Sequence, residues 1–276
     1  MKNILKWTGI VLGGLIGLTL LAGVALYPSG MEKLTRSYPG IPVETVKIPT
    51  DADAVARGRH ISIVWGCAKC HGDDLRGTLL TNDPILGTIP ASNLTSGKGG
   101  IANSYTDADW IRAIRHGVMP DSRVEAFMYD YSTMSDRDLG ALIAYLKQIP
   151  PVDSDYPAIR FGPIVPIAPA VGLLMPAAEL IAHGAPRPAD PVPGATIEYG
   201  KYLYALCTEC HGTSLARKLG KWNQEDFIRA LRTGVLPNGK HLSPAMSSKT
   251  FGEMSDVELA ALWLYLQSTP AVTSQK

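Results

Sequence analysis

The sequence lacks an excess of charge of either sign. Its 276 residues include 26 Lys and Arg against 25 Asp and Glu, a formal net charge of +1 at pH 7. A protein that binds nucleic acid by neutralising phosphates needs a clear basic excess, so we expect no nucleic-acid partner. Charged residues make up only 18% of the chain and hydrophobic residues 46%, and this balance excludes a disordered or solvating tail.

Cysteine is also scarce, and its four copies all belong to two Cys-x-x-Cys-His motifs: Cys67, Cys70 and His71, then Cys207, Cys210 and His211. Two thiols at this spacing can add to the two vinyl groups of haem, and the adjacent His then binds the iron from the same side. A thioredoxin-like redox pair, a structural zinc site and plain disulfides are the alternatives. The redox pair normally sits in a βαβ pattern, which is absent here, and a shared zinc site would join two motifs that each have their own helices. We therefore predict two covalently bound haem c groups.

Charge is missing altogether between residues 7 and 31. Residues 7–27 are almost wholly apolar, about the length of a helix that crosses ~30 Å of hydrocarbon. Lys2 and Lys6 precede them, so the positive-inside rule keeps the N-terminus in the cytoplasm. We predict a single-pass anchor over residues 1–30 in the cytoplasmic membrane, with the rest of the chain on the periplasmic or extracytoplasmic side. A cleaved signal peptide is the alternative.

A second uncharged run covers residues 161–178 and contains four prolines. Each proline removes a backbone donor and clashes with the preceding turn, which argues against a regular spanning helix. We interpret this run as an extended connector laid over an apolar domain surface, with a membrane-surface role as the alternative. It lies within residues 151–193, a Pro- and Ala-rich stretch that we predict to be a linker.

Each Cys-x-x-Cys-His motif heads one copy of a longer repeat. The segment that begins at Ser135 recurs from Ser255, and residues 110–118 recur as residues 227–235. No stretch shows sustained strand alternation, and each copy has the pattern of three helices. These are a helix before the motif (54–66; 196–206), a middle helix (107–116; 224–233) and a last helix that begins at a serine cap and ends at Pro150 or Pro270. We predict an all-α fold with domains over residues 51–150 and 194–272.

These patterns resemble the class I cytochromes c, and more closely their diheme, membrane-anchored members, in which a Pro-rich linker joins two such domains. The resemblance covers about residues 54–272 and rests on residues 65–72, 181–188 and 198–203 and on the last helices, which carry Tyr145 and Tyr265. It implies two tandem class I domains behind an N-terminal transmembrane helix. It also implies electron transfer between redox protein partners of a respiratory or photosynthetic chain. A haem subunit of a dehydrogenase or oxidase complex, and a diheme enzyme such as a peroxidase, are the alternatives.

In that family a methionine ahead of the last helix completes the iron coordination. Met246 lies in the family's Pro-Ala-Met pattern, and Met128 lies ahead of the first copy's last helix, with Met119 as its competitor. The resemblance therefore implies the ligand pairs His71 with Met128 and His211 with Met246. Two strong axial ligands leave no open position on the iron, which favours an electron carrier over a catalyst. A bis-His site would instead use one of the remaining histidines, none of which repeats: His60, His116, His183 and His241.

The first copy has a longer segment between its motif and its middle helix. Within this segment, Asn93 and Thr95 could hydrogen-bond haem propionates, as similar loops in the family do, or could belong to a surface insertion. Tyr145 and Tyr265 recur at one position of the last helix, and we expect them to pack where the first and last helices of each copy cross.

Overall fold

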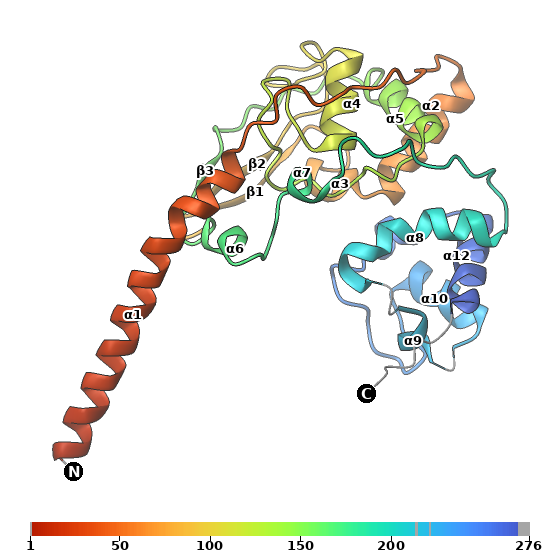
Figure 1. The fold of residues 1–276 in the computed structure, drawn as a ribbon. Helices are drawn as coiled ribbons and strands as arrows, with labels where there is room; N and C mark the ends of the chain where they lie inside the picture. Colours follow the sequence, from red (N-terminus) through yellow and green to blue (C-terminus); the bar gives the residue numbers. More distant parts are fainter. Residues whose placement is uncertain (1, 213–214, 221, 270–276) are drawn as a thin grey trace. The chain divides into compact units, whose positions relative to one another are not determined.

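The structure, a computed structural model, describes residues 2–212, 215–220 and 222–269. It is mostly helical with one small sheet (Figure 1). The chain divides into two compact units, each drawn from three segments. Unit 1 contains Met1–Thr45, Arg76–Ser132 and Pro151–Ala185, and unit 2 contains Val46–Leu75, Thr133–Pro150 and Pro186–Lys276.

The N-terminal helix of unit 1, α1, runs over Lys2–Thr35. Within the described residues it is the one helix long and apolar enough to cross a membrane, as its composition predicted. Its apolar side chains are exposed from Ile4 to Val24. Near its end, α1 packs against the short helix α6 (Ile167–Ala170) at Gly30, where an added Cβ would lie 1.6 Å from the Pro166 carbonyl oxygen. Only a glycine permits so close an approach.

Unit 1 also contains an antiparallel sheet, so the prediction of a purely helical fold was too strict. Its strands are β1 (Thr78–Asp83), β2 (Gly87–Ala91) and β3 (Arg160–Phe161), in that order across the sheet. The register shifts between Leu79 and Thr81, as at a β-bulge. A bulge interrupts the alternation of side chains between the two faces, so the strand period is missing from the sequence.

The loop after β2 holds the start of the linker. The Asn93 amide donates to the Val152 carbonyl at 2.8 Å, and the Thr95 hydroxyl both donates to that carbonyl and accepts from the Val152 N–H, at 3.1 Å each. Asn93 and Thr95 are both buried. Their side chains therefore bind the backbone of the linker. The predicted middle helix, α4 (Asp107–His116), and the short α7 (Ala177–Leu180) complete the unit's helices.

In unit 2 two helix pairs pack in the same way. The helix α2 (Ala52–Val64) packs on α5 (Asp136–Leu146), and α8 (Ile197–His211) packs on α12 (Asp256–Ser268). An added Cβ on Gly58 would lie 2.0 Å from a carbonyl oxygen of α5, and one on Gly200 would lie 2.0 Å from a carbonyl oxygen of α12. Tyr145 and Tyr265 lie at these same two contacts, which confirms their predicted place at the crossings.

The predicted serine caps are also confirmed. The Ser135 hydroxyl accepts the Asp138 N–H, and the Ser255 hydroxyl accepts the Glu258 N–H, at 3.2 Å each. The predicted end of the second copy, Pro270, lies outside the described residues. The remaining helices of unit 2 are α3 (Cys67–His71), α9 (Leu215–Leu219), α10 (Gln224–Thr233) and α11 (Ser248–Phe251), and α10 has the predicted bounds of the second middle helix.

Candidate haem sites

The first Cys-x-x-Cys-His motif forms a short helix of its own, α3 (Cys67–His71). The preceding helix, α2, stops at Val64, and Gly66 takes a left-handed conformation with φ 78° and ψ 19°. Glycine adopts this conformation without steric cost, so the chain can turn between the two helices. Cys67 and Cys70 stand three residues apart, and side chains at this spacing share one face of a helix. Two thiols and the following imidazole are thus gathered within one turn.

The second motif forms the last turn of α8, which continues without a break from Ile197 to His211. The predicted helix ended at residue 206 and was therefore too short. Beyond His211 the chain turns at Gly212, whose φ is 53°. The Tyr204 hydroxyl donates to the Gly212 carbonyl at 2.6 Å and so ties this turn back to the helix.

The first cysteine of each motif lies in surroundings that favour the neutral thiol. Burial raises the pKa of Cys67 to about 12 and the pKa of Cys207 to about 12, so both stay protonated at neutral pH. Addition of a thiol across a vinyl group needs no leaving group, because its sulfur and its hydrogen both end in the thioether product. Each motif therefore offers two thiols and one imidazole within a single helical turn, a donor set that fits covalently attached haem.

The predicted methionine ligands fall in different units. Met246 is half-buried in a turn of unit 2, where its N–H donates to the Ser243 carbonyl at 2.8 Å, and the whole second motif belongs to the same unit. Met128 belongs to unit 1, whereas the first motif belongs to unit 2. Both ligand pairs, His71 with Met128 and His211 with Met246, stay predictions.

A turn of the same kind follows α4 and α10. Met119 lies in the turn after α4, so its counterpart in the second copy can be identified. The Met119 N–H donates to the Arg123 carbonyl at 2.8 Å, and the Leu236 N–H donates to the Lys240 carbonyl at 2.7 Å in the equivalent turn. Isolated bridges close both turns, from Val118 to Val124 and from Val235 to His241. Met119 thus takes the place of a leucine in the second copy, and no methionine corresponds to it there.

Three of the four other histidines are bound to protein side chains. His60 Nε2 lies 2.8 Å from a carboxylate oxygen of Glu258. The Nδ1 atoms of His116 and His183 lie 3.1 Å apart, and His116 Nε2 lies 3.4 Å from a Glu44 oxygen. Burial lowers the pKa of His116 despite the Glu44 charge, which favours its neutral form. These contacts give the three histidines the hydrogen-bonding roles that such residues commonly have.

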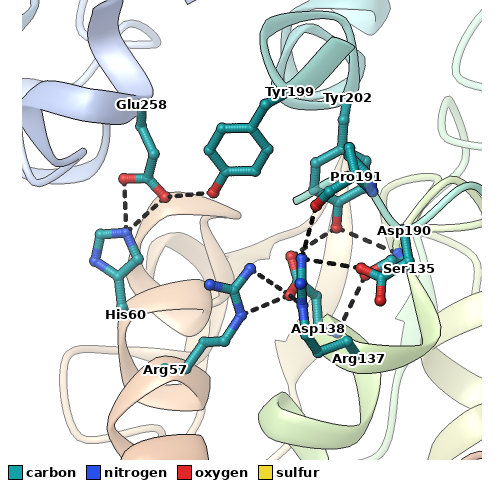
Figure 2. A network of polar contacts seen from close by, with 10 residues as sticks. All are labelled: Arg57, His60, Ser135, Arg137, Asp138, Asp190, Pro191, Tyr199, Tyr202 and Glu258. Carbon is teal, nitrogen blue, oxygen red and sulfur yellow. Dashed lines mark hydrogen bonds and ion pairs between the residues drawn. The ribbon is translucent and has the colours of Figure 1, made fainter. Parts of the chain in front are cut away.

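A polar network in unit 2, which no sequence pattern indicated, joins α2 and α5 to α8 and α12 (Figure 2). Asp138 accepts from the Arg57 guanidinium at 2.7 Å and from the Tyr202 hydroxyl at 2.8 Å. Glu258 binds His60 at 2.8 Å and accepts from the Tyr199 hydroxyl at 3.3 Å. The capping pattern identifies each carboxylate only as the third residue of its helix. It does not indicate that the carboxylate also binds side chains of other helices.

The network shifts the ionisation of two of its members. Burial alone would raise the pKa of Glu258, but the bond from His60 and the Ser255 N–H together hold that pKa below its usual value. Burial has the opposite effect on a cation and alone would lower the pKa of Arg57, but the Asp138 charge holds that pKa above its usual value. Asp138 and Glu258 are both buried, and the hydrogen bonds they accept offset the cost of removing their charges from water.

Lys69 also makes contacts that no sequence pattern predicted. It lies between the two cysteines of the first motif, at a position that the motif leaves open. Its Nζ donates to the Ala245 carbonyl at 2.9 Å and lies 5.5 Å from the centre of the Phe251 ring. Because Ala245 precedes Met246, the first motif directly contacts the turn that carries the second predicted methionine ligand.

Comparison with known proteins fits these sites. A family model described as cytochrome c matches residues 55–150. The fructose dehydrogenase cytochrome subunit of Gluconobacter japonicus is 25% identical over 272 residues, which cover 83% of this chain and 55% of the relative. The gluconate 2-dehydrogenase cytochrome c subunit of Pantoea cypripedii is 32% identical over 179 residues, which cover 57% and 37%. A diheme cytochrome c-type protein of Cereibacter sphaeroides is 26% identical over 305 residues, which cover 93% and 97%.

The chain spans about half the length of the fructose dehydrogenase subunit and nearly the whole diheme cytochrome. The family match falls on the first motif and its helices, and the longer relatives extend the similarity over both motifs. The donor set of each motif suits the same prosthetic group. The chain is therefore similar to c-type cytochromes, a diheme member among them, and this similarity supports covalently bound haem.

Proposed function

We propose that the chain is a membrane-tethered electron carrier with two haem c groups, one in each copy. Cys67 and Cys70 would hold the first, with His71 and Met128 as iron ligands. Cys207 and Cys210 would hold the second, with His211 and Met246. The observation that carries this proposal is that each motif follows or ends a helix that crosses the last helix of its copy through a glycine contact. The full-length similarity to a diheme cytochrome supports the count of two.

The proposed organisation follows the repeat. Residues 1–30 would form the tether, and residues 51–150 and 194–272 the two tandem cytochrome domains, joined by the linker 151–193. The haem domains would lie on the outer face of the cytoplasmic membrane. The length and apolar surface of α1 support the tether, and Lys2 and Lys6 support the orientation.

In this proposal the chain's residues make a site for electron transfer rather than for substrate. Bound haem supplies one-electron chemistry at its iron. An imidazole and a thioether sulfur would fill both axial positions, and the soft sulfur favours the reduced state. The bond from Lys69 to Ala245 supports a relay, because it connects the first motif to the turn beside Met246. The match of Met119 to a leucine in the second copy favours Met128 as the first copy's ligand.

A second candidate is a haem subunit of a dehydrogenase complex. The names of two relatives favour it, since both are cytochrome subunits of dehydrogenases. Purification of the chain in mild detergent separates the two candidates. A stoichiometric redox partner supports the subunit, and a chain that purifies alone yet exchanges electrons with added donors supports the free carrier.

The haem count and the ligands are tested on the purified full chain. We expect two haems per chain in the pyridine haemochrome assay, and about half that count in either double variant, Cys67→Ala with Cys70→Ala or Cys207→Ala with Cys210→Ala. Met128→Leu and Met246→Leu should each remove about half of the near-infrared band from methionine bound to ferric iron. Met119→Leu is the matched control and should leave the band unchanged. A wild-type count below two contradicts the proposal, and ready carbon monoxide binding to one ferrous haem favours an enzyme.

A further inference from the structure

The segment after β3 is fixed to the end of α1. Three contacts, spaced about one helical turn apart along α1, hold it there. They join Gly30 to the Pro166 backbone, Lys33 Nζ to the Pro169 carbonyl at 2.8 Å, and the Arg36 guanidinium to Glu179 at 2.8 Å. All six residues belong to unit 1. The segment is therefore not a loose linker at this point, and its position along α1 is defined.

This segment presents apolar side chains to the outside. Residues 171–174 are exposed without interruption, and Leu173 and Leu174 are 63% and 74% exposed. On either side, Pro169 and Ala177 are buried and attach the turn to the unit. We call residues 171–174 the leucine turn. Our expectation that this part of the chain lies with its apolar residues over a domain surface was wrong for the leucine turn.

The backbone of the leucine turn is unusual for leucine. Gly172 has φ 80°, and Leu174 has φ 47°, in the left-handed region where glycine or asparagine is the ordinary choice. A turn that served only as a connection would be formed more easily by those residues. A leucine here carries a large apolar side chain into solvent, which points to a function for that side chain.

The position of the leucine turn along α1 identifies what covers it. The apolar stretch of α1 ends near residue 27, and at 1.5 Å per residue Gly30 lies about 5 Å farther along the axis. The headgroup layer on each side of the hydrocarbon is roughly 5–7 Å thick. Because α6 packs on Gly30, it lies at headgroup depth when α1 spans the membrane. Figure 1 shows α6 beside α1, near the end of its exposed length.

We propose that the leucine turn inserts into the lipid surface beside α1 and gives unit 1 a second membrane contact. The inference rests on the proposed tether. Apolar side chains gain free energy when they leave water for the boundary between headgroups and acyl chains. The four prolines of residues 161–178 oppose a spanning helix, so this contact lies on the membrane rather than across it. One helix alone would leave α1 and unit 1 free to tilt and to rotate together about the α1 axis, and the second contact restricts that motion.

The test uses the full chain in lipid nanodiscs of phosphatidylcholine. Leu174→Cys is labelled with a bimane fluorophore, and Val171→Cys provides a second reporting position. Ala108→Cys is the matched control, since Ala108 is exposed on α4, which lies away from the exposed length of α1 (Figure 1). We expect nitroxide lipids labelled near the headgroup to quench Leu174 several-fold more than Ala108, and iodide in water to quench Leu174 several-fold less.

The outcomes separate the inference from the tether. A chain that leaves the membrane in alkaline carbonate overturns both. A chain that stays in the membrane, with residue 174 as accessible to iodide as residue 108, overturns the inference alone. Protection from iodide without quenching by the lipid nitroxide also overturns it, because a protein surface then covers the leucine turn.

Discussion

The first and last helices of the two copies cross in the same way, but the polar groups beside the crossings differ. In α2, Arg57 precedes the crossing glycine and His60 follows it by two positions. In α8 the equivalent residues beside Gly200 are Tyr199 and Tyr202. The same two positions of a helix therefore carry basic side chains in the first copy and phenols in the second.

The contacts of these residues are reciprocal within unit 2. Arg57 and Tyr199 each bind the carboxylate in the last helix of their own copy, whereas His60 and Tyr202 each bind the carboxylate of the other copy (Figure 2). Such exchange of equivalent contacts is the pattern of a two-fold interface. The comparison teaches that backbone packing and contact pattern are shared between the copies, while the basic side chains come from α2 alone.

The largest expected effect is a clash at the shared crossings. Gly58→Ala and Gly200→Ala would each place a Cβ 2.0 Å from a carbonyl oxygen of the opposite helix. Since backbone cannot move aside as a flexible side chain can, we expect each variant to lose about 3 kcal/mol of unfolding free energy. Denaturant titration of the holoprotein measures it. Gly194→Ala is the control, because its Cβ would meet only a methyl group at 3.7 Å. If alanine is tolerated at one of the two glycines, the two helix crossings are not equivalent.

The next largest effect is a difference in stability loss between variants of the two carboxylates, Asp138 and Glu258. Asp138→Asn leaves the Arg57 guanidinium without its counter-charge, and we expect a loss of about 2 kcal/mol, below the value for a fully buried pair because Arg57 is partly exposed. Glu258→Gln should cost less, about 1 kcal/mol, because glutamine can still hydrogen-bond the His60 imidazole, whereas asparagine cannot balance the permanent charge of Arg57. A double-mutant cycle with Arg57→Gln isolates the first pair. Equal losses for the two carboxylates contradict the assignment of unequal charge.

The helices of this comparison could be predicted where local signals agree. The bounds of α4 and α10 match the prediction because each has a capping residue before it and a glycine after it. The place of Tyr145 and Tyr265 could be predicted because the repeat itself showed that they are equivalent.

The features that could not be predicted depend on tertiary contacts. The break between α2 and α3 requires a left-handed Gly66, but a glycine within a helical pattern does not reveal its own φ. The β1–β2 pairing contains a register shift that removes the strand period. Arg57 and His60 look like ordinary exposed helix residues, because their partners lie 81 and 198 positions away in the sequence.

The pH dependence of stability sharpens the contrast between His60 and Arg57. The pKa of Glu258 is lower in the folded chain than its ordinary value, so the unfolded chain binds a proton more readily. The stability that Glu258 contributes is therefore present above the unfolded pKa, near 4.5, and is lost as pH falls through the folded pKa. We expect the gap in stability between wild type and Glu258→Gln to shrink over this acidic range. His60→Gln is the control: in the His60→Gln background, Glu258→Gln should cost less stability than in the wild type already at neutral pH.

The smallest expected effect distinguishes the two tyrosines. The Tyr202 hydroxyl donates to Asp138 at 2.8 Å and accepts the Ser135 N–H at 3.2 Å, so Tyr202→Phe removes two contacts from a buried site. The Tyr199 hydroxyl donates to Glu258 at the longer distance of 3.3 Å. We expect losses of about 1 kcal/mol for Tyr202→Phe and roughly 0.3 kcal/mol for Tyr199→Phe in denaturant titration. Because Tyr202 binds the other copy's carboxylate and Tyr199 its own, this order means that the exchanged contact is the stronger one in α8. The reverse order would mean that the contact within the copy is the stronger one, and that the contacts exchanged between the copies contribute little to stability.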